Sequence, residues 1–281
     1  MFGRLLRSSP ARRAAACAAV SGAATFACAA PASSSGDAPA GGAFSSRPGG
    51  TLWAFGNNLS GCLGLGDEKK RTRPTLVEHL EHTPAVFLSA RDNNSAVLDA
   101  EGNMYTFGSG EFGNLGAAAY SLDMPCATVP IKVAGGGGGG GEGGAAIKTN
   151  QTHKVCVGTF HSLCIDGDGA LFAWGRASKG QLGLGKDRRS NQGTPTRVEG
   201  VPGAARDIAC GRSFSLCLND LGDVYSWGDG ADGALGHGDK ARAAVPTKVA
   251  ALAGKGVVQV AAGRDSSFAL CGDGRVFSWG R

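Results

Sequence analysis

The sequence predicts an all-β protein built from propeller blades, each a sheet of about four short antiparallel strands. A strand that ends in an aromatic residue and glycine recurs five times, at intervals of 52, 67, 53 and 52 residues. Its apolar residues lie on both faces, which indicates a sheet covered on both sides. Glycine is frequent, with 48 among 281 residues, as a fold of many tight turns requires. The five strand ends are Trp53-Ala54-Phe55-Gly56, Tyr105-Thr106-Phe107-Gly108, Phe172-Ala173-Trp174-Gly175, Tyr225-Ser226-Trp227-Gly228 and Phe277-Ser278-Trp279-Gly280.

Glycine and proline recur at fixed offsets inside each unit. In the third copy the strand-ending Gly175 is followed five residues later by Gly180, and three residues after that by Gly183, which Leu182 precedes. Such fixed spacing indicates one supersecondary unit copied along the chain. Each loop leads to the pattern Pro-x-x-Val, which begins at Pro195 in this copy. Proline lacks the N–H that a sheet needs, so it predicts the first residue of a strand or an edge strand.

Two further strands complete each unit. Residues 155–158 form a short apolar strand that ends in glycine, and residues 162–165 form the next. The turn at 166–169 then leads into the following aromatic strand, and such Asp-Gly turns between apolar runs predict hairpins. The second copy is longer than the others, and its polyglycine run at 135–141 predicts a flexible loop with no ligand role.

The first 50 residues differ from the rest in charge. Residues 1–50 hold five arginines and one aspartate, a net charge of +4, and are rich in Ala and Ser. We expect a disordered targeting segment and a mitochondrial location, with a plastid transit peptide or a secretory signal as alternatives. No membrane span is expected, because the uncharged run at 14–36 is mostly small residues. Residues 51–281 carry only +1, which gives little support for nucleic-acid binding. The repeats are expected at about 51–103, 104–170, 171–223 and 224–275, with a partial copy at 276–281.

The nine cysteines raise the question of disulfides or zinc, yet no Cys-x-x-Cys pair occurs. Cys164 and Cys217 occupy a slot that Val97 and Ala269 fill in other copies. Exchange with Val and Ala predicts buried, reduced residues that act as small hydrophobic side chains. Metal or redox chemistry is the alternative.

Two glycine patterns resemble cofactor loops. Residues 108–113 and 228–233 both read Gly-x-Gly-x-x-Gly after a strand. A dinucleotide site also needs a helix that starts there, so we interpret both as repeat turns. The Asp-Gly run at 166–169 does not match a calcium loop, because Leu171 and Ala177 stand where glycine and glutamate are required. No cofactor or metal site is therefore expected.

His161 is the histidine that stands within the repeat pattern. Its equivalents in other copies are Asn94, Phe214 and Ser266, so no ring of histidines is expected. We predict a hydrogen-bonded structural role, with partner contact as the alternative. No histidine has a matched nucleophile or acid at a recognisable spacing, so we predict no catalytic residues and no enzyme activity.

The aromatic-Gly strand, the Gly-x-Leu-Gly loop, Pro-x-x-Val and the small-Gly-x-x-His-Ser segment together resemble the RCC1 (regulator of chromosome condensation) repeat superfamily. The resemblance covers residues 51–281, and the layout with a presequence is similar to that of mitochondrial RCC1-like proteins. It implies an RCC1-type β-propeller, which in this family commonly closes with seven blades. About four and a half repeats are present here, so we expect an incomplete ring, an open arc whose end sheets expose apolar faces, or closure through another chain. A light-sensing tryptophan cluster occurs in one branch, but its loop motif is not visible here, and the tryptophan slots indicate core packing.

The resemblance implies a non-enzymatic scaffold whose loops bind a protein partner. The alternative is a guanine-nucleotide exchange factor for a small GTPase, the activity known for the founding member. Candidate partner contacts are the variable loop residues between the fixed glycines, with solvated loops as the alternative. They are Asn57, Asn58, Glu111, Phe112, Arg176, Lys179, Asp229 and Asp232.

Overall fold

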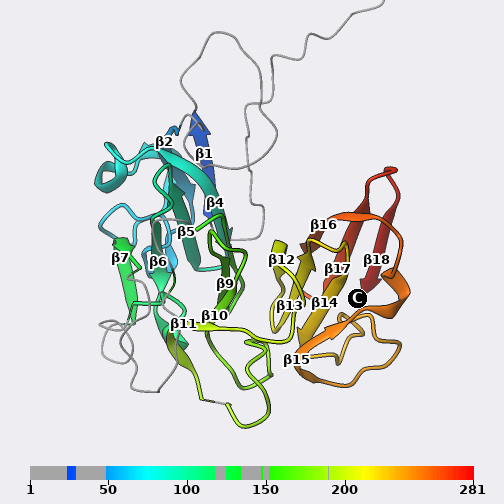
Figure 1. The fold of residues 1–281 in the computed structure, drawn as a ribbon. Coiled ribbons are helices and arrows are strands. Elements are labelled where there is room, and N and C mark those ends of the chain that lie inside the picture. The colour runs from blue at the N-terminus through cyan, green and yellow to red at the C-terminus, as the bar shows by residue number, and fades with distance from the viewer. Residues whose placement is uncertain (1–23, 30–48, 118–124, 134–146, 148–151, 189) are drawn as a thin grey trace, which may run out of the picture.

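The computed structural model describes residues 24–29, 49–117, 125–133, 147, 152–188 and 190–281. Its described residues form five antiparallel sheets, A to E, that follow one another along the chain in an open arc (Figure 1). Sheet A contains β1 (Ala24–Ala29), β2 (Thr51–Gly56) and β3 (Arg71–Leu76). Sheet B contains β4 (Ala85–Arg91), β5 (Asn94–Asp99), β6 (Met104–Ser109) and β7 (Cys126–Lys132). Sheet C contains β8 (Lys154–Val157), β9 (His161–Ile165), β10 (Leu171–Gly175) and β11 (Gln192–Arg197). Sheet D contains β12 (Ala205–Cys210), β13 (Phe214–Asn219), β14 (Val224–Gly228) and β15 (Ala243–Lys248). Sheet E contains β16 (Val257–Ala262), β17 (Ser266–Cys271) and β18 (Val276–Gly280).

Each sheet pairs its strands in sequence order; among the described residues, sheets B, C and D have four strands and sheets A and E have three, so the predicted all-β architecture with antiparallel blades of about four strands is confirmed. The aromatic strand is the third strand of its sheet, or the second in sheet A. A sequence repeat that begins at the aromatic strand therefore contributes the last two strands of one sheet and the first two strands of the next. Residues 51–103, for example, contribute β2 and β3 to sheet A and β4 and β5 to sheet B. Each repeat thus links two neighbouring sheets covalently. Strand β1 lies within the segment expected to be a presequence and pairs with β2; residues 1–23 and 30–48 of that segment lie outside the described residues.

The contact between neighbouring sheets explains the aromatic and Leu-Gly motifs together. Trp227 of β14 is fully buried, and its indole N–H donates to the carbonyl of Gln181 in the preceding sheet, 2.9 Å away. A Cβ on Gly183 would lie 2.8 Å from the Trp227 Nε1 atom, and the φ of Gly183 is +73°. Only glycine fits there without strain or displacement. The same indole-to-carbonyl bond recurs at Trp174 and Trp279, which confirms the core role of these slots.

The prolines of Pro-x-x-Val lie inside the outermost strands β3, β7, β11 and β15. These are edge strands, where a residue without an N–H is tolerated, as predicted. The register against the aromatic strand shifts in all four cases, for example between Ala173 and Gly175. Each outermost strand thus pairs with the aromatic strand through a β-bulge or a similar irregularity.

The first strands of sheets B to E, which are β4, β8, β12 and β16, line a central cavity of about 620 Å³. Arg91 ends β4 at the position where other copies have glycine. Its Nη1 atom donates to the carbonyls of Cys210 (2.7 Å) and Ala262 (3.3 Å), which belong to sheets D and E. One side chain thus connects the inner edges of three sheets across the cavity.

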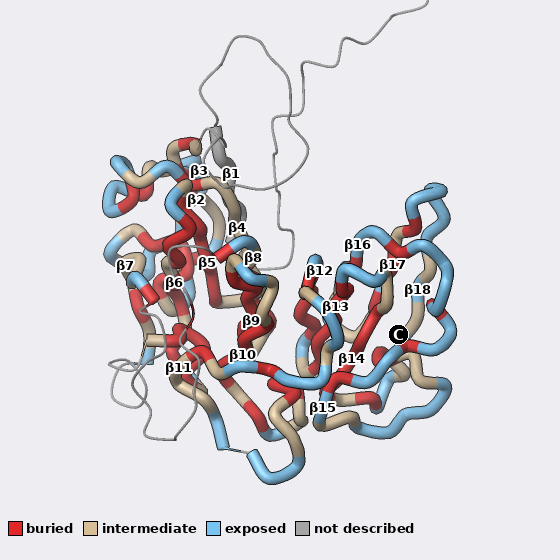
Figure 2. The backbone as a smooth tube through the Cα atoms, viewed as in Figure 1, coloured by how far each residue is buried: buried red, intermediate tan, exposed pale blue. Residues whose placement is uncertain are grey.

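The ends of the arc expose apolar residues, as expected. Leu216 and Val224 are buried between sheets D and E. Their equivalents on sheet E, Phe268 and Val276, are 38% and 63% exposed. Figure 2 shows this change from buried residues along β14 to exposed and half-buried residues along β18. At the other end, Trp53 is 37% exposed.

Candidate partner-binding site on the loop face

One face of the arc carries the turns between the first two strands of sheets B to E and the loops that follow the aromatic strands; we call it the loop face. Its geometry repeats because the residue after each strand-ending glycine donates its N–H to a carbonyl in the adjacent turn. In sheet C, Arg176 donates to Phe160 (2.8 Å), and in sheet D, Asp229 donates to Ser213 (2.9 Å). This bond holds the first variable residue of each loop beside the turn of its own sheet.

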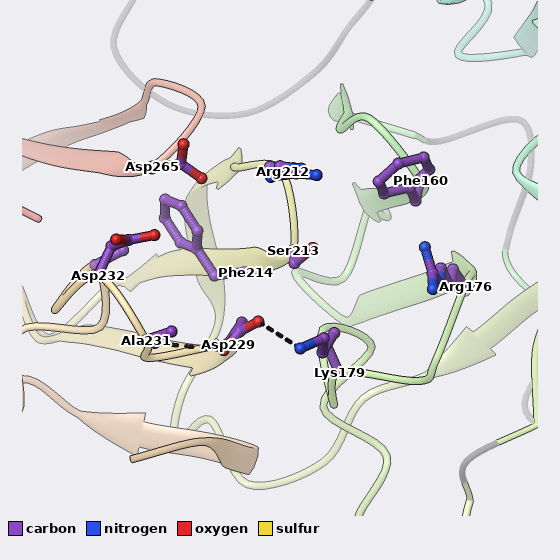
Figure 3. A pocket seen from close by; sticks show the side chains of 11 residues that line it. Phe160, Arg176, Lys179, Arg212, Ser213, Phe214, Asp229, Ala231, Asp232 and Asp265 are labelled. Atoms are coloured by element: carbon purple, nitrogen blue, oxygen red, sulfur yellow. Dashed lines mark hydrogen bonds and ion pairs between the residues drawn. The ribbon is translucent and has the colours of Figure 1, made fainter. Parts of the chain in front are cut away.

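A pocket of about 270 Å³ opens on the loop face where the loops of sheets C, D and E meet. Three basic and three acidic side chains surround it. Figure 3 shows Arg176 and Lys179 of sheet C on one side, with the acidic groups on loops of sheets D and E across from them. The six charged residues are Arg176, Lys179, Arg212, Asp229, Asp232 and Asp265. All three acidic groups thus come from sheets D and E, whereas the basic groups come from sheet C and, in the case of Arg212, from a turn of sheet D, and the formal charges balance.

One ion pair crosses this pocket. Lys179 Nζ lies 3.1 Å from Asp229 Oδ2, and the Lys179 side chain is 44% exposed. A solvent-exposed pair of this kind contributes at most about 1 kcal/mol to stability. It connects the loop of sheet C to the loop of sheet D.

Arg176 is held in place by aromatic rings. Its guanidinium carbon lies 4.9 Å from the ring centroid of Phe112 and 5.2 Å from that of Phe160. The two rings meet edge to face at 5.7 Å, and Arg176 Nε donates to Ser178 Oγ at 2.8 Å. Cation–π contacts of this type add of order 0.5–1 kcal/mol each at exposed sites. Arg176 is thus pre-ordered beside the pocket, which lowers the entropy lost when a partner binds it.

Four of the eight residues predicted as partner contacts line this pocket: Arg176, Lys179, Asp229 and Asp232. Phe112 joins them through its contact with Arg176. Glu111 is exposed beside it in the 3-10 turn Glu111–Gly113, and Asn57 is exposed in the loop of sheet A.

Asn58 does not fit the expectation of a surface contact. It is fully buried; its side-chain nitrogen donates to the carbonyl of Asp67 (2.7 Å), and its side-chain oxygen accepts the N–H of Leu63 (2.8 Å). The loop needs these bonds because its own backbone groups are otherwise unpaired there. Asn58 is therefore a structural residue of the loop.

Phe160, Arg212 and Asp265 also line the pocket and were not among the predicted contacts. All three lie in hairpin turns, outside the loops between the fixed glycines. One sequence feature could have indicated these turns. The position just before each hairpin turn, such as Gly158, is always 17 residues before the glycine that ends the aromatic strand, such as Gly175, so each turn lies beside the loop that follows that strand.

His161 has the structural role predicted for it. Its Nε2 lies 2.9 Å from Ser215 Oγ, and that hydroxyl donates its hydrogen to the carbonyl of Gln181 (2.8 Å). Since the hydroxyl has one hydrogen, His161 Nε2 must carry the proton and donate. Burial, with the positive charge of Arg91 adding to it, lowers the pKa of His161 from 6.5 to about 3. The ring is neutral near pH 7 and is enclosed away from any substrate.

The described residues contain no group of three or more His, Cys, Asp or Glu side chains placed to hold a metal ion. After β6, the glycine pattern at 108–113 continues into the three-residue 3-10 turn Glu111–Gly113, which gives no helix N-terminus for a dinucleotide. At 166–169 the Asp166 carboxylate accepts the N–H groups of Asp168 and Ala170, as in a hairpin turn. Within the same described part of the chain, no helix is long and apolar enough to cross a bilayer.

Comparison with known proteins finds one matching family model and several similar proteins. The family model described as RCC1-like domain matches residues 39–281. The human E3 ubiquitin-protein ligase HERC2 is 33% identical over 237 residues, which are 83% of this chain and 5% of that protein. The mitochondrial RCC1 domain-containing protein RUG3 of Arabidopsis thaliana is 31% identical over 236 residues, or 82% of this chain and 50% of RUG3.

Among solved structures, Prp20p of Saccharomyces cerevisiae aligns with a TM-score of 0.63 at 21% identity, covering 83% of this chain and 52% of Prp20p. This likeness concerns the fold. The chain spans about half the length of RUG3 and of Prp20p. With the family model covering most of its length, and with the repeat geometry described above, the chain belongs to the RCC1-like domain family.

Proposed function

We propose that this chain is a non-enzymatic protein-interaction scaffold that works in mitochondria and binds its partner through the loop face. The observation that carries the proposal is the pocket lined by both basic and acidic groups, with Arg176 packed against the rings of Phe112 and Phe160. Arginine and aromatic residues are enriched among the side chains that contribute most of the binding energy at the centre of protein interfaces. The acidic and basic groups favour a protein segment that carries both charges.

The relatives support this proposal at a coarser level. Prp20p has been described together with its binding to Gsp1p and histones, so a protein of this fold binds other proteins. RUG3 is a mitochondrial protein, which supports an organellar location. HERC2 is a ubiquitin ligase, but this chain matches only 5% of its length, so that activity is not transferred to this chain.

A photo-crosslinking amino acid placed at Asp232 tests the loop face, and the same amino acid at Leu221 is the matched control. Both positions are exposed on sheet D, and Leu221 lies in the β13–β14 turn at the opposite end of the sheet. We expect a specific adduct in cells from position 232, none from position 221, and loss of the adduct when R176E is added. Equal adducts at both positions, or an adduct that R176E leaves unchanged, would reject the loop face as the binding site.

The second candidate function is nucleotide exchange on a small GTPase, and the observation that favours it is the structural likeness to Prp20p, which binds Gsp1p. An exchange factor binds the nucleotide-free GTPase more tightly than the loaded form, so it needs no covalent chemistry. Release of fluorescent GDP from Gsp1p should be measured with and without a small molar fraction of this chain. Accelerated release would favour exchange activity over a scaffold alone; unchanged release argues against exchange on this GTPase.

The location has its own test. Residues 1–50 fused to a fluorescent reporter should direct it to mitochondria, because this segment is basic and nearly free of acidic residues. Diffuse cytosolic fluorescence would contradict the mitochondrial location.

A further inference from the structure

Two cysteines lie side by side on the wall of the central cavity, one on each of two neighbouring sheets. Cys156 belongs to β8 of sheet C and Cys210 to β12 of sheet D. The N–H of Cys210 donates to Cys156 Sγ at 3.1 Å, and Cys210 Sγ donates to the carbonyl of Cys156 at 3.3 Å. Each sulfur thus contacts the backbone of the other residue, so the two cysteines lie against each other across the boundary between the sheets.

The surroundings of Cys156 favour a thiolate. The residue is half-buried and lines the cavity together with Arg91 and Lys154. The neighbouring Cys210 side chain, then the N–H of Cys210 and the charges of Arg91 and Lys154, lower the pKa of Cys156 despite its burial. The nearby carboxylate of Asp207 is occupied by its ion pair with Lys154 and by the N–H of Val260.

Cys210 has the opposite character. It is 2% exposed, and burial raises its pKa. A partly accessible low-pKa thiol beside a buried neutral one is the arrangement in which the first is attacked by oxidant and the second resolves the product.

Four other cysteines of the described chain have a different setting. Cys62, Cys164 and Cys217 are buried, and burial raises the pKa of each. Cys126 is half-buried like Cys156, but desolvation and the neighbouring Glu68 carboxylate, 3.4 Å away, raise its pKa. Cys126 is therefore a matched comparison for reactivity, because it differs from Cys156 in charge environment more than in burial class.

We propose that Cys156 is a peroxide-reactive thiol and that Cys210 converts its oxidised form into a disulfide between sheets C and D. The Cys156 thiolate attacks one oxygen of hydrogen peroxide, the O–O bond breaks, and sulfenic acid and hydroxide form. The Cys210 thiol then attacks the sulfenic sulfur, the S–S bond forms, and water leaves. In total two thiols are oxidised and one peroxide is reduced to two waters.

The disulfide would join residues 54 positions apart on the inner strands of two blades. Those strands carry the cavity wall, and Arg91 already binds the Cys210 carbonyl there. Oxidation would therefore fix the relative position of sheets C and D, and through it the shape of the arc. This inference does not depend on the identity of the partner.

The test uses the full chain, reduced and then treated with hydrogen peroxide. We expect a disulfide-linked peptide pair containing Cys156 and Cys210 in a non-reducing digest. In C210A the sulfenic acid at Cys156 should persist and react with dimedone, whereas C126A should form the disulfide like the wild type. Recovery of other pairings only, or dimedone labelling of C210A at residues other than Cys156, would overturn the proposal.

A second measurement needs no disulfide and so does not depend on the geometry of bond formation. Iodoacetamide at pH 7 should alkylate Cys156 faster than Cys126 by on the order of tenfold, because the rate follows the thiolate fraction. R91K keeps the positive charge and should retain most of this difference, whereas R91M should reduce it. Equal alkylation of the two cysteines in the wild type would contradict the reactive-thiol assignment.

Discussion

Acidification is expected to destabilise this protein through one buried side chain, His161. In the folded chain its ring is enclosed and neutral, with a pKa lowered to about 3 by burial. In the unfolded chain the ring is in water and takes up a proton near its ordinary pKa of about 6.5. Because only the unfolded state binds this proton between these two values, stability is present above pH 6.5 and is lost as the pH falls toward 3.

The magnitude follows from the two pKa values. Each pH unit below the unfolded pKa costs about 1.4 kcal/mol, so the His161 contribution at pH 5 is a loss of about 2 kcal/mol relative to pH 7. This is a large fraction of the stability of an ordinary domain. Ser215 cannot offset the loss, because it already accepts the Nε2 hydrogen, and the additional proton would go to the buried Nδ1 atom, which has no hydrogen-bond partner in the described part of the chain.

The matched variant is H161N, because asparagine stands at the equivalent position, Asn94, in sheet B. Urea unfolding followed by tryptophan fluorescence at pH 7 and pH 5 gives the loss of stability for each protein. We expect the wild type to lose about 2 kcal/mol more than H161N, since other titrating groups are common to both. If H161N loses as much stability as the wild type, the neutral buried histidine is not the cause and the reasoning fails.

Two further predictions compare matched positions. G183A should destabilise the protein more than G185A. Both glycines have positive φ, so both variants lose about 1–2 kcal/mol through backbone strain. A Cβ at position 183 also meets the indole of Trp227, which adds a further loss of about 1–3 kcal/mol. Equal urea midpoints for the two variants would contradict the Trp–Gly contact. L216D should cost at least about 3–5 kcal/mol, because Leu216 is fully buried between sheets, whereas F268D at the equivalent exposed position should cost less than about 1 kcal/mol. Similar thermal midpoints for these two variants would show that the last sheet is covered in solution.

Several features were predicted correctly because they depend on short-range pattern. The aromatic strand, the spaced glycines and the edge prolines each reflect a local requirement, such as bulk at Trp227, absence of a Cβ at Gly183, or a missing N–H at Pro195. These requirements recur in every blade, so the repeat pattern of the sequence reveals them. The structural role of His161 was predicted in the same way, from the different residues that fill its slot.

The candidate site was predicted only in part, because a repeat pattern does not show which way a loop side chain turns. Asn57 and Asn58 are neighbours in one loop, yet Asn57 is exposed and Asn58 is fully buried. The pocket also needs Arg212 and Asp265, which lie in hairpin turns of two sheets and meet the loop of a third only when the sheets are assembled.

By itself the sequence determined the blade fold, the number of repeats, and the repeat positions that need a bulky residue, a small residue or a residue without a backbone N–H. These properties depend on packing and hydrogen bonding that recur in each repeat. Only the tertiary structure decided which groups of different units meet. The contact of Arg91 with Cys210 and Ala262 joins residues 119 and 171 positions apart, and the Cys156–Cys210 pair lies between two blades. Such contacts depend on how the sheets curve around a common centre, and that curvature results from the packing of whole sheets against one another.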